Sequence, residues 1–245
     1  MLLLDLELIH QYDKTASADS LAAASSELLS TVGVTVESKR FNPKQGPLLI
    51  VSNHPGSLDG HVLISTFKND DFYIIGMASN ELMGKTYVSH LLPVYGVRRM
   101  RDHISALLLE NLGTQSLNSE EEARSKNRET ISKASKLVSS GSSVIILPEG
   151  AGGGSTSDRS WKPGVGFLVK QITNPDTKIV FVKITGGSGF DFLRHAKLFI
   201  RRLLGKTNVT VEYSPLLSLF SMINQEDDGK TIAKMLEQIY KNQFS

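Results

Sequence analysis

A histidine and an aspartate five residues apart are the pair in this sequence whose residue types and spacing best suit catalysis. His54 and Asp59 lie in the segment VSNHPGSLDG (residues 51–60), after an apolar run typical of a buried strand and before an amphipathic run. Catalytic groups in open α/β sheets gather where the strands end. A histidine that hydrogen-bonds a carboxylate is held in one tautomer, and its imidazolium form is stabilised. Such a pair predicts a general base that removes a proton from a hydroxyl near neutral pH.

The turn between these two residues decides whether their side chains meet. Pro55 and Gly56 bend the chain, so His54 and Asp59 are expected to converge. The spacing alone also fits a simpler interpretation, in which Asp59 caps a helix and His54 is an ordinary turn residue. Of the six histidines, only His54 has a carboxylate five residues later.

A second carboxylate follows another apolar run, in Pro148-Glu149-Gly150. A carboxylate followed by glycine at the end of a strand can reach a bound hydroxyl while the backbone approaches closely. The glycine run at residues 152–154 is weak evidence for a phosphate loop, because it lacks the Lys-Ser/Thr ending of a P-loop.

Three arginines within four residues form a candidate anion site. They follow the run Pro93-Val94-Tyr95-Gly96-Val97 and are Arg98, Arg99 and Arg101. Guanidinium groups bind phosphate through two parallel hydrogen bonds, which makes such a cluster suitable for a phosphorylated substrate. The alternative is a solvated basic edge of a strand.

The composition is that of a globular protein and narrows the classes of function. The chain has 245 residues, 40% of them hydrophobic, with 27 basic and 25 acidic residues that leave a net charge of +2. That balance argues against a nucleic-acid-binding protein, which usually carries a strong basic excess. The absence of cysteine excludes disulfides, thiolate metal sites and a cysteine nucleophile.

The N-terminal residues MLLLDLELIH are not expected to be a signal peptide. The apolar start is short, is broken by Asp5 and Glu7, and has no basic region before it. No stretch of the sequence approaches the roughly 18 uncharged apolar residues that a membrane-spanning helix needs. Any contact with a membrane is therefore expected from the side.

Short runs rich in Val, Ile and Tyr alternate with helical patterns along the chain. The expected strands are 34–41, 48–52, 72–76, 94–98, 143–147, 178–185 and 208–213. The expected helices are 17–30, 58–67, 80–91, 119–140, 163–172, 190–204 and 228–242. The alternation predicts an α/β sandwich with a mostly parallel or mixed central sheet flanked by helices.

Along the chain, the His54–Asp59 segment, the arginine cluster and Pro148-Glu149-Gly150 form three polar blocks. In this order they resemble the lysophospholipid and glycerol-3-phosphate acyltransferase family, the PlsC-like enzymes with an Asn-His-x4-Asp block. Asn53, His54 and Asp59 fill the first block, and Pro148-Glu149-Gly150 fills the core of the third. The segment Trp161-Lys162-Pro163-Gly164 also resembles the basic-glycine start of a helix in that family. The resemblance covers residues 48–185.

The resemblance implies one acyltransferase domain over 1–245, with a motif-bearing core at about 34–215, an N-terminal helical segment at 1–33 and a C-terminal helix at 216–245. It implies that His54 deprotonates the acceptor hydroxyl and that Asp59 orients His54. The acyl donor would be acyl-CoA or acyl-carrier protein, the acceptor a lysophospholipid such as 1-acylglycerol-3-phosphate, and no metal or prosthetic group would be required. The expected substrate-binding residues are Asn53, Ser57, Glu149, Gly150 and one of Arg98, Arg99 and Arg101.

The residues that follow Pro-Glu-Gly depart from the family pattern and leave the acceptor open. Family members commonly continue Pro-Glu-Gly with Thr and Arg, whereas this chain has Ala151 and Gly152. A phosphate contact is thereby missing, so the acceptor could be a non-glycerolipid, and a non-catalytic lipid-binding protein is the competing interpretation. A serine hydrolase at Ser188 is disfavoured, because Gly186-Gly187-Ser188-Gly189 lacks the spacing of a nucleophile elbow.

A basic amphipathic segment at residues 190–206 is the expected membrane contact. Its Phe and Leu side chains fall on one helical face, and its five basic residues follow Asp191 without another acid. The alternative is that this apolar face packs on the sheet. The expected location is the cytoplasm, peripheral on the inner face of a membrane, with no nucleic-acid partner.

Overall fold

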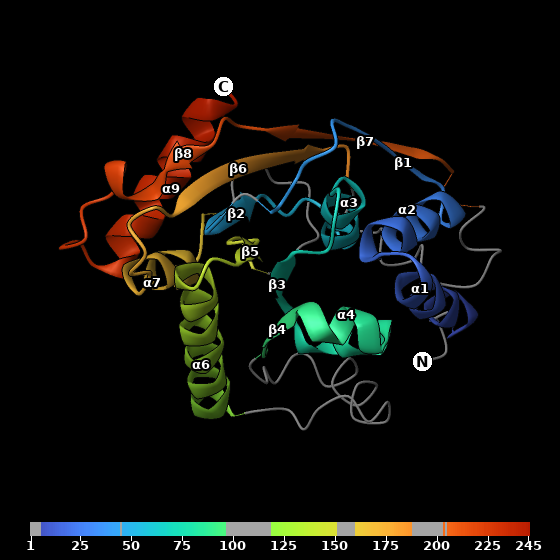
Figure 1. Ribbon diagram of the computed structural model, residues 1–245, viewed down its shortest axis with the longest axis horizontal. Coiled ribbons are helices and arrows are strands. Elements are labelled where there is room, and N and C mark those ends of the chain that lie inside the picture. The colour runs from blue at the N-terminus through green and yellow to red at the C-terminus, as the bar shows by residue number, and fades with distance from the viewer. Residues whose placement is uncertain (1–5, 45, 97–118, 151–159, 188–202, 204) are drawn as a thin grey trace.

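A mixed β-sheet forms the centre of the part of the chain that the computed structural model describes, residues 6–44, 46–96, 119–150, 160–187, 203 and 205–245 (Figure 1). Its strand order is β1-β7-β6-β2-β5-β3-β4, and the short β8 also pairs with β6. The strands are β1 (Val34–Ser38), β2 (Leu48–Ser52), β3 (Phe72–Met77), β4 (Leu91–Val94), β5 (Ser143–Ile146), β6 (Lys178–Thr185), β7 (Thr207–Tyr213) and β8 (Leu217–Ser218).

Most neighbouring strands are parallel, and the antiparallel pairs all involve β6. Strands β7 and β8 pair with β6 in antiparallel fashion, whereas β6, β2, β5, β3 and β4 run parallel to one another. Parallel strands end at the same edge of a sheet, so the segments that follow β6, β2 and β5 leave the sheet side by side. The expected mostly parallel or mixed sheet is confirmed.

Helices cover both faces of the sheet (Figure 1). One layer contains α1 (Leu6–Ala18), α2 (Leu21–Thr31), α3 (Asp59–Ser65), the 3-10 helix η1 (Ala78–Met83) and α4 (Lys85–His90). The other contains α6 (Glu120–Ser139), α7 (Gly164–Lys170), the 3-10 helix η4 (Leu219–Ser221) and α9 (Gly229–Gln243). The described chain is therefore one α/β sandwich, as the sequence predicts.

Strand β2 lies between the two helix layers, and this position explains why its sequence is continuously apolar from Leu48 to Val51. Leu48 and Ile50 belong to the core on the α2–α3 side, and Leu49 and Val51 belong to the core on the α6–α9 side. All four side chains are fully buried. Alternate residues of a strand point to opposite faces, so a strand between two helix layers needs apolar residues at every position.

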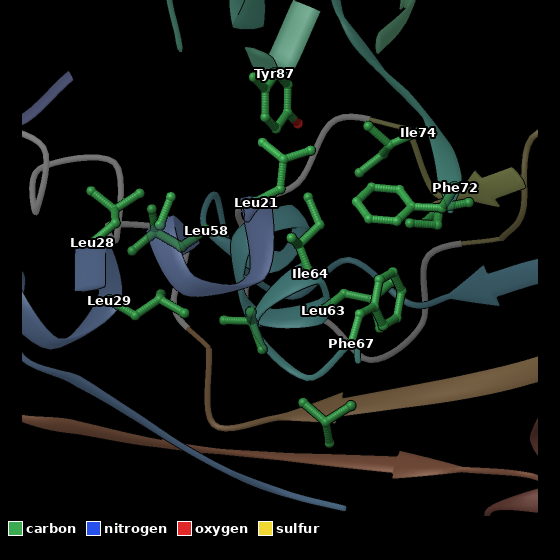
Figure 2. Close-up of a cluster of buried hydrophobic side chains, with 14 of the residues drawn as sticks. Leu21, Leu28, Leu29, Leu58, Leu63, Ile64, Phe67, Phe72, Ile74 and Tyr87 are labelled. Carbon is green, nitrogen blue, oxygen red and sulfur yellow. The ribbon is translucent and has the colours of Figure 1, made fainter. Parts of the chain in front are cut away.

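The short helix α3 is held in place by the first of these cores. Figure 2 shows Leu58, Leu63 and Ile64 clustered with leucines of α2. Burying an apolar side chain of this size stabilises the fold by about 1.5–3 kcal/mol. A helix of seven residues is too short to be stable alone, so this packing fixes the position of its first residue, Asp59.

Polar side chains cap the first turns of helices α6 and α9. Ser119 accepts a hydrogen bond from the backbone N–H of Glu122, whose carboxylate accepts one from the N–H of Ser119, and this capping box begins α6. These hydrogen bonds lower the pKa of Glu122, because they favour the charged carboxylate. Asp228 caps α9 in a similar way through Lys230 and Thr231.

Several expected boundaries are wrong. The helix expected at 80–91 is two elements, η1 and α4, separated at Gly84, whose φ of 100° is incompatible with a helix. The strand expected at 94–98 is β4, which begins at Leu91 and ends at Val94. Its pairing ends there because the amide of Asn127 binds both the N–H and the C=O of Tyr95.

The N-terminal helical segment also differs in detail from the expectation. The single helix expected at 17–30 is α2, which Ser20 caps through the N–H of Ala23, and a separate helix α1 precedes it. Leu8 of α1 is buried in the core, whereas Leu6 is exposed. No helix in the described ranges is long and apolar enough to cross a membrane.

Helices α7 and α9 approach each other through a pair of glycines. A Cβ atom on Gly166 would lie 1.8 Å from the carbonyl oxygen of Gly229, and a Cβ atom on Gly229 would lie 2.4 Å from the ring of Phe167. Both distances are far below van der Waals contact. The two glycines therefore set how closely α9 can lie on α7.

We expect Gly166→Ala to lower the free energy of unfolding by about 1–3 kcal/mol, because the methyl group must push α9 away from α7. The matched control is Gly164→Ala in the same helix, where a Cβ atom would meet only Ile131, at 3.9 Å. Urea unfolding measures both variants. Equal midpoints for the two variants would contradict the role assigned to this contact.

Candidate active site

A single carboxylate oxygen holds the turn that follows β2. Oδ2 of Asp59 accepts a hydrogen bond from the backbone N–H of Gly56 at 2.7 Å and lies 2.8 Å from Nδ1 of His54. The Asp59 side chain is 2% exposed, so the carboxylate is almost completely removed from water. Buried charges require such partners. The expected convergence of His54 and Asp59 is therefore what the structure has.

The two members of the pair differ in their access to solvent. The His54 side chain is 19% exposed, whereas Asp59 lies behind it in the protein. Because Nδ1 faces Asp59, the other ring nitrogen, Nε2, is the one left for a substrate. Ser57, an expected substrate-binding residue, is exposed in the same turn.

The expected substrate-binding residue Asn53 is engaged with the neighbouring strand β6. Its side-chain Nδ2 donates to the carbonyl of Ile184 at 2.9 Å, and its Oδ1 accepts from the N–H of Ile184 at 2.7 Å. The amide therefore extends the pairing of β2 with β6 beyond the last residue of β2. Whether Asn53 also contacts a substrate stays a prediction.

Glu149 and Gly150 lie in a tight turn on the other neighbouring strand, β5. The pairing of Val51 with Ile146 brings the ends of β2 and β5 together at one edge of the sheet. The N–H of Gly150 donates to the carbonyl of Leu147, and the φ of Gly150 is 85°, a conformation that favours glycine. The first and third polar blocks thus leave adjacent strands in the same direction.

Helix α9 is connected to this turn through Trp161 and Lys162. The N–H of Lys162 donates to the carbonyl of Pro148 at 2.7 Å, and the N–H of Trp161 donates to the carboxylate of Glu237 at 3.0 Å. The Trp161 ring packs against Tyr240, at 5.4 Å between ring centroids. Burial raises the pKa of Tyr240, and the nearby carboxylate of Glu149 raises it further.

A family comparison agrees with this arrangement. The model of the family described as Acyltransferase matches residues 33–185, which contain both the histidine turn and the Glu149 turn. This chain belongs to the acyltransferase family. The family expected from the three polar blocks is confirmed.

A search of curated proteins finds no matching sequence. Among solved structures, the chain is similar to the 1-acyl-sn-glycerophosphate (LPA) acyltransferase PlsC from Thermotoga maritima, with 15% identity and a TM-score of 0.45. That match covers 97% of this chain and 80% of the other.

Some expected residues of the acyltransferase lie outside the described residues. They include Arg98, Arg99 and Arg101, the glycine run at 152–154, Ser188 and most of the segment at 190–206. The strand that precedes the arginines, β4, ends at the same edge as β3, with Met77 opposite Val94. In the strand order, β5 and β3 separate β4 from β2.

Two residues at the site were not among those expected to bind substrate or catalyse. Gly187 follows β6, and a Cβ atom there would lie 3.3 Å from Oδ1 of Asp59. Lys162 lies along the turn of the third block, because a Cβ atom on Gly150 would lie 3.6 Å from its Cγ. The basic-glycine segment around Lys162 was a usable sequence signal, whereas nothing local to Gly187 pointed to Asp59.

We expect Asp59→Ala to be less stable than Asp59→Asn by about 1–3 kcal/mol, because only alanine leaves the buried N–H of Gly56 without an acceptor. The asparagine retains one oxygen that can take this hydrogen bond, while both variants remove the charge. Urea unfolding of the two variants measures the difference. Indistinguishable stabilities would mean that the turn does not depend on this oxygen.

Proposed function

We propose that this chain is an O-acyltransferase that moves a fatty acyl group from a thioester donor to the hydroxyl of a lysophospholipid, such as 1-acylglycerol-3-phosphate. Membership of the acyltransferase family supports the reaction class. The observation that carries the proposal is the 2.8 Å contact between a partly exposed His54 and a buried Asp59. A lipid-binding protein without activity has no need for such a base.

In the proposed reaction, His54 is the general base. Its Nδ1–H bonds Asp59, so Nε2 takes the proton of the acceptor hydroxyl as the hydroxyl oxygen attacks the thioester carbonyl. The tetrahedral intermediate then expels the thiolate, which takes the proton back from the imidazolium. The products are the new ester and the free thiol, and His54 returns to its neutral form. The carboxylate of Asp59 stabilises the imidazolium between these two steps.

The acyl donor in this proposal is acyl-CoA or acyl-carrier protein, and the acceptor is anionic. Lys162 is the described residue that best suits the phosphate of the acceptor. Its backbone is tied to Pro148, its side chain is exposed, and its ammonium group has no ion-pair partner among the described residues. It offers a positive charge beside Gly150, two residues before the position at which family members commonly have an arginine.

A lysolipid acceptor requires contact with a membrane surface. We therefore propose peripheral attachment from the cytoplasmic side, with residues 190–206 as the contact. The basic composition of that segment supports the proposal, since each Lys or Arg near an anionic surface contributes about 1 kcal/mol.

We expect His54→Ala to lower kcat by about 100- to 10,000-fold, because the acceptor hydroxyl loses its general base. The assay incubates the purified protein with mixed acyl-CoAs and a panel of lysolipids and identifies the products by mass spectrometry. His10→Ala, on the exposed side of α1, is the matched control. Full activity in His54→Ala would exclude the mechanism. Lysolipid binding without transfer in the wild type would favour a lipid-binding protein.

We expect Lys162→Gln to raise the KM for a phosphate-bearing acceptor by about 10- to 100-fold, since a hydrogen bond to a charged group contributes about 1.5–3 kcal/mol. Lys162→Arg should retain most of the affinity. Comparison of 1-acylglycerol-3-phosphate with a monoacylglycerol, which has no phosphate, isolates the effect. Equal changes with both acceptors, or a rise only in the KM of the CoA donor, would contradict the assignment.

A further inference from the structure

The carboxyl end of β6 contacts the segments that carry both members of the His54–Asp59 pair. We propose that this strand end positions the pair, through Asn53 on the His54 side and through Gly187 on the Asp59 side. Asn53 is then a positioning residue rather than a substrate ligand. The inference rests on the proposed function for the role of His54, and on separate contacts for the role of β6.

In the first contact, the side chain of Asn53 continues the pairing of β2 with β6 beyond the end of β2. The N–H of Asn53 still donates to the carbonyl of Val182, at 3.4 Å, as a residue of β2 would. Its own carbonyl has left the sheet and accepts a hydrogen bond from the buried hydroxyl of Ser52 at 3.1 Å. The side-chain amide takes over both backbone groups of Ile184. The chain can therefore turn away at His54 while the preceding residue stays bound to β6.

The second contact comes from the turn that follows β6. Gly186 has a φ of 96°, and a Cβ atom there would lie 2.2 Å from the carbonyl oxygen of Asn208, so this position requires glycine. The turn brings Gly187 onto Asp59. A Cβ atom on Gly187 would lie 3.3 Å from Oδ1 of Asp59 and 3.5 Å from the N of Gly56. A side chain at position 187 would therefore press on Oδ1, the carboxylate oxygen of Asp59 that does not bind His54.

Together these contacts restrict the relative position of the two catalytic side chains. Asn53 is adjacent to His54 in sequence, and Gly187 lies beside Asp59, so the end of β6 and the turn after it, Ile184 to Gly187, act as a common support for both catalytic residues. Misplacement of a catalytic group by about 1 Å can cost about 100-fold in rate. Loss of either contact should therefore lower the rate of the chemical step without weakening the binding of either substrate.

The decisive variant is Asn53→Ala, with Asn174→Ala as the matched control. The amide of Asn174 also donates to a backbone carbonyl, that of Ser139, and accepts from a backbone N–H, that of Asp176, but it precedes the amino end of β6. Both variants thus lose two hydrogen bonds of the same kind. We expect kcat to fall by about 10- to 100-fold in Asn53→Ala alone, with the KM of donor and acceptor unchanged.

A second measurement does not depend on activity. We expect the proton between Nδ1 of His54 and Asp59 to give a low-field NMR signal, which His54→Ala would identify by its loss. We expect this signal to be weakened or shifted in Asn53→Ala and retained in Asn174→Ala. Gly187→Ala, whose added methyl group would press on Asp59, should also shift it and lower kcat by about tenfold or more. Gly187→Ala serves as the test if Asn53→Ala does not fold.

The outcomes separate this inference from the proposed function. A raised KM in Asn53→Ala with an unchanged proton signal would show that Asn53 binds substrate and would overturn the inference. If kcat and the proton signal were both unchanged in Asn53→Ala or in Gly187→Ala, the inference would also be overturned. Full activity in His54→Ala would instead overturn the proposed function, and the proton signal would still report whether β6 positions the pair.

Discussion

The buried carboxylate of Asp59 is the constraint on which the site depends. A carboxylate with almost no exposure to water is tolerated only if donors meet it, and here one of its oxygens meets both the N–H of Gly56 and the ring of His54. The turn must therefore fold back on the first residue of α3. That requirement explains why a proline, a buried glycine and a short helix packed on α2 follow β2 so closely.

The strand order then decides which segments can surround this turn. Strand β2 lies between β6 and β5, both parallel to it, so the segments after all three strands emerge at one edge. Gly187 reaches the turn from one side, and the Glu149 turn lies on the other. Residues far apart in the chain, such as His54 and Glu149, are thereby brought to the same edge of the sheet.

Interactions within a few residues could be predicted from the sequence, and those across the sheet could not. The capping box of α6, the apolar strand β2 and the His54–Asp59 contact all depend on local spacing. The partner of Asn53, 131 residues away, depends on which strand lies beside β2. The end of β4 was misplaced for the same reason, because Asn127 of α6 takes the backbone groups of Tyr95.

The residues proposed for proton transfer and the residue proposed to bind the acceptor are held in place differently. The residues proposed for proton transfer are held by buried contacts to β6 and α2, which leave little room for change. Lys162, the residue proposed to meet the acceptor, has an exposed side chain, and its backbone is fixed by Pro148 and by the neighbouring Trp161–Glu237 contact. Substitutions there, such as Ala151 and Gly152 in place of Thr and Arg, can alter the acceptor while the base remains in place.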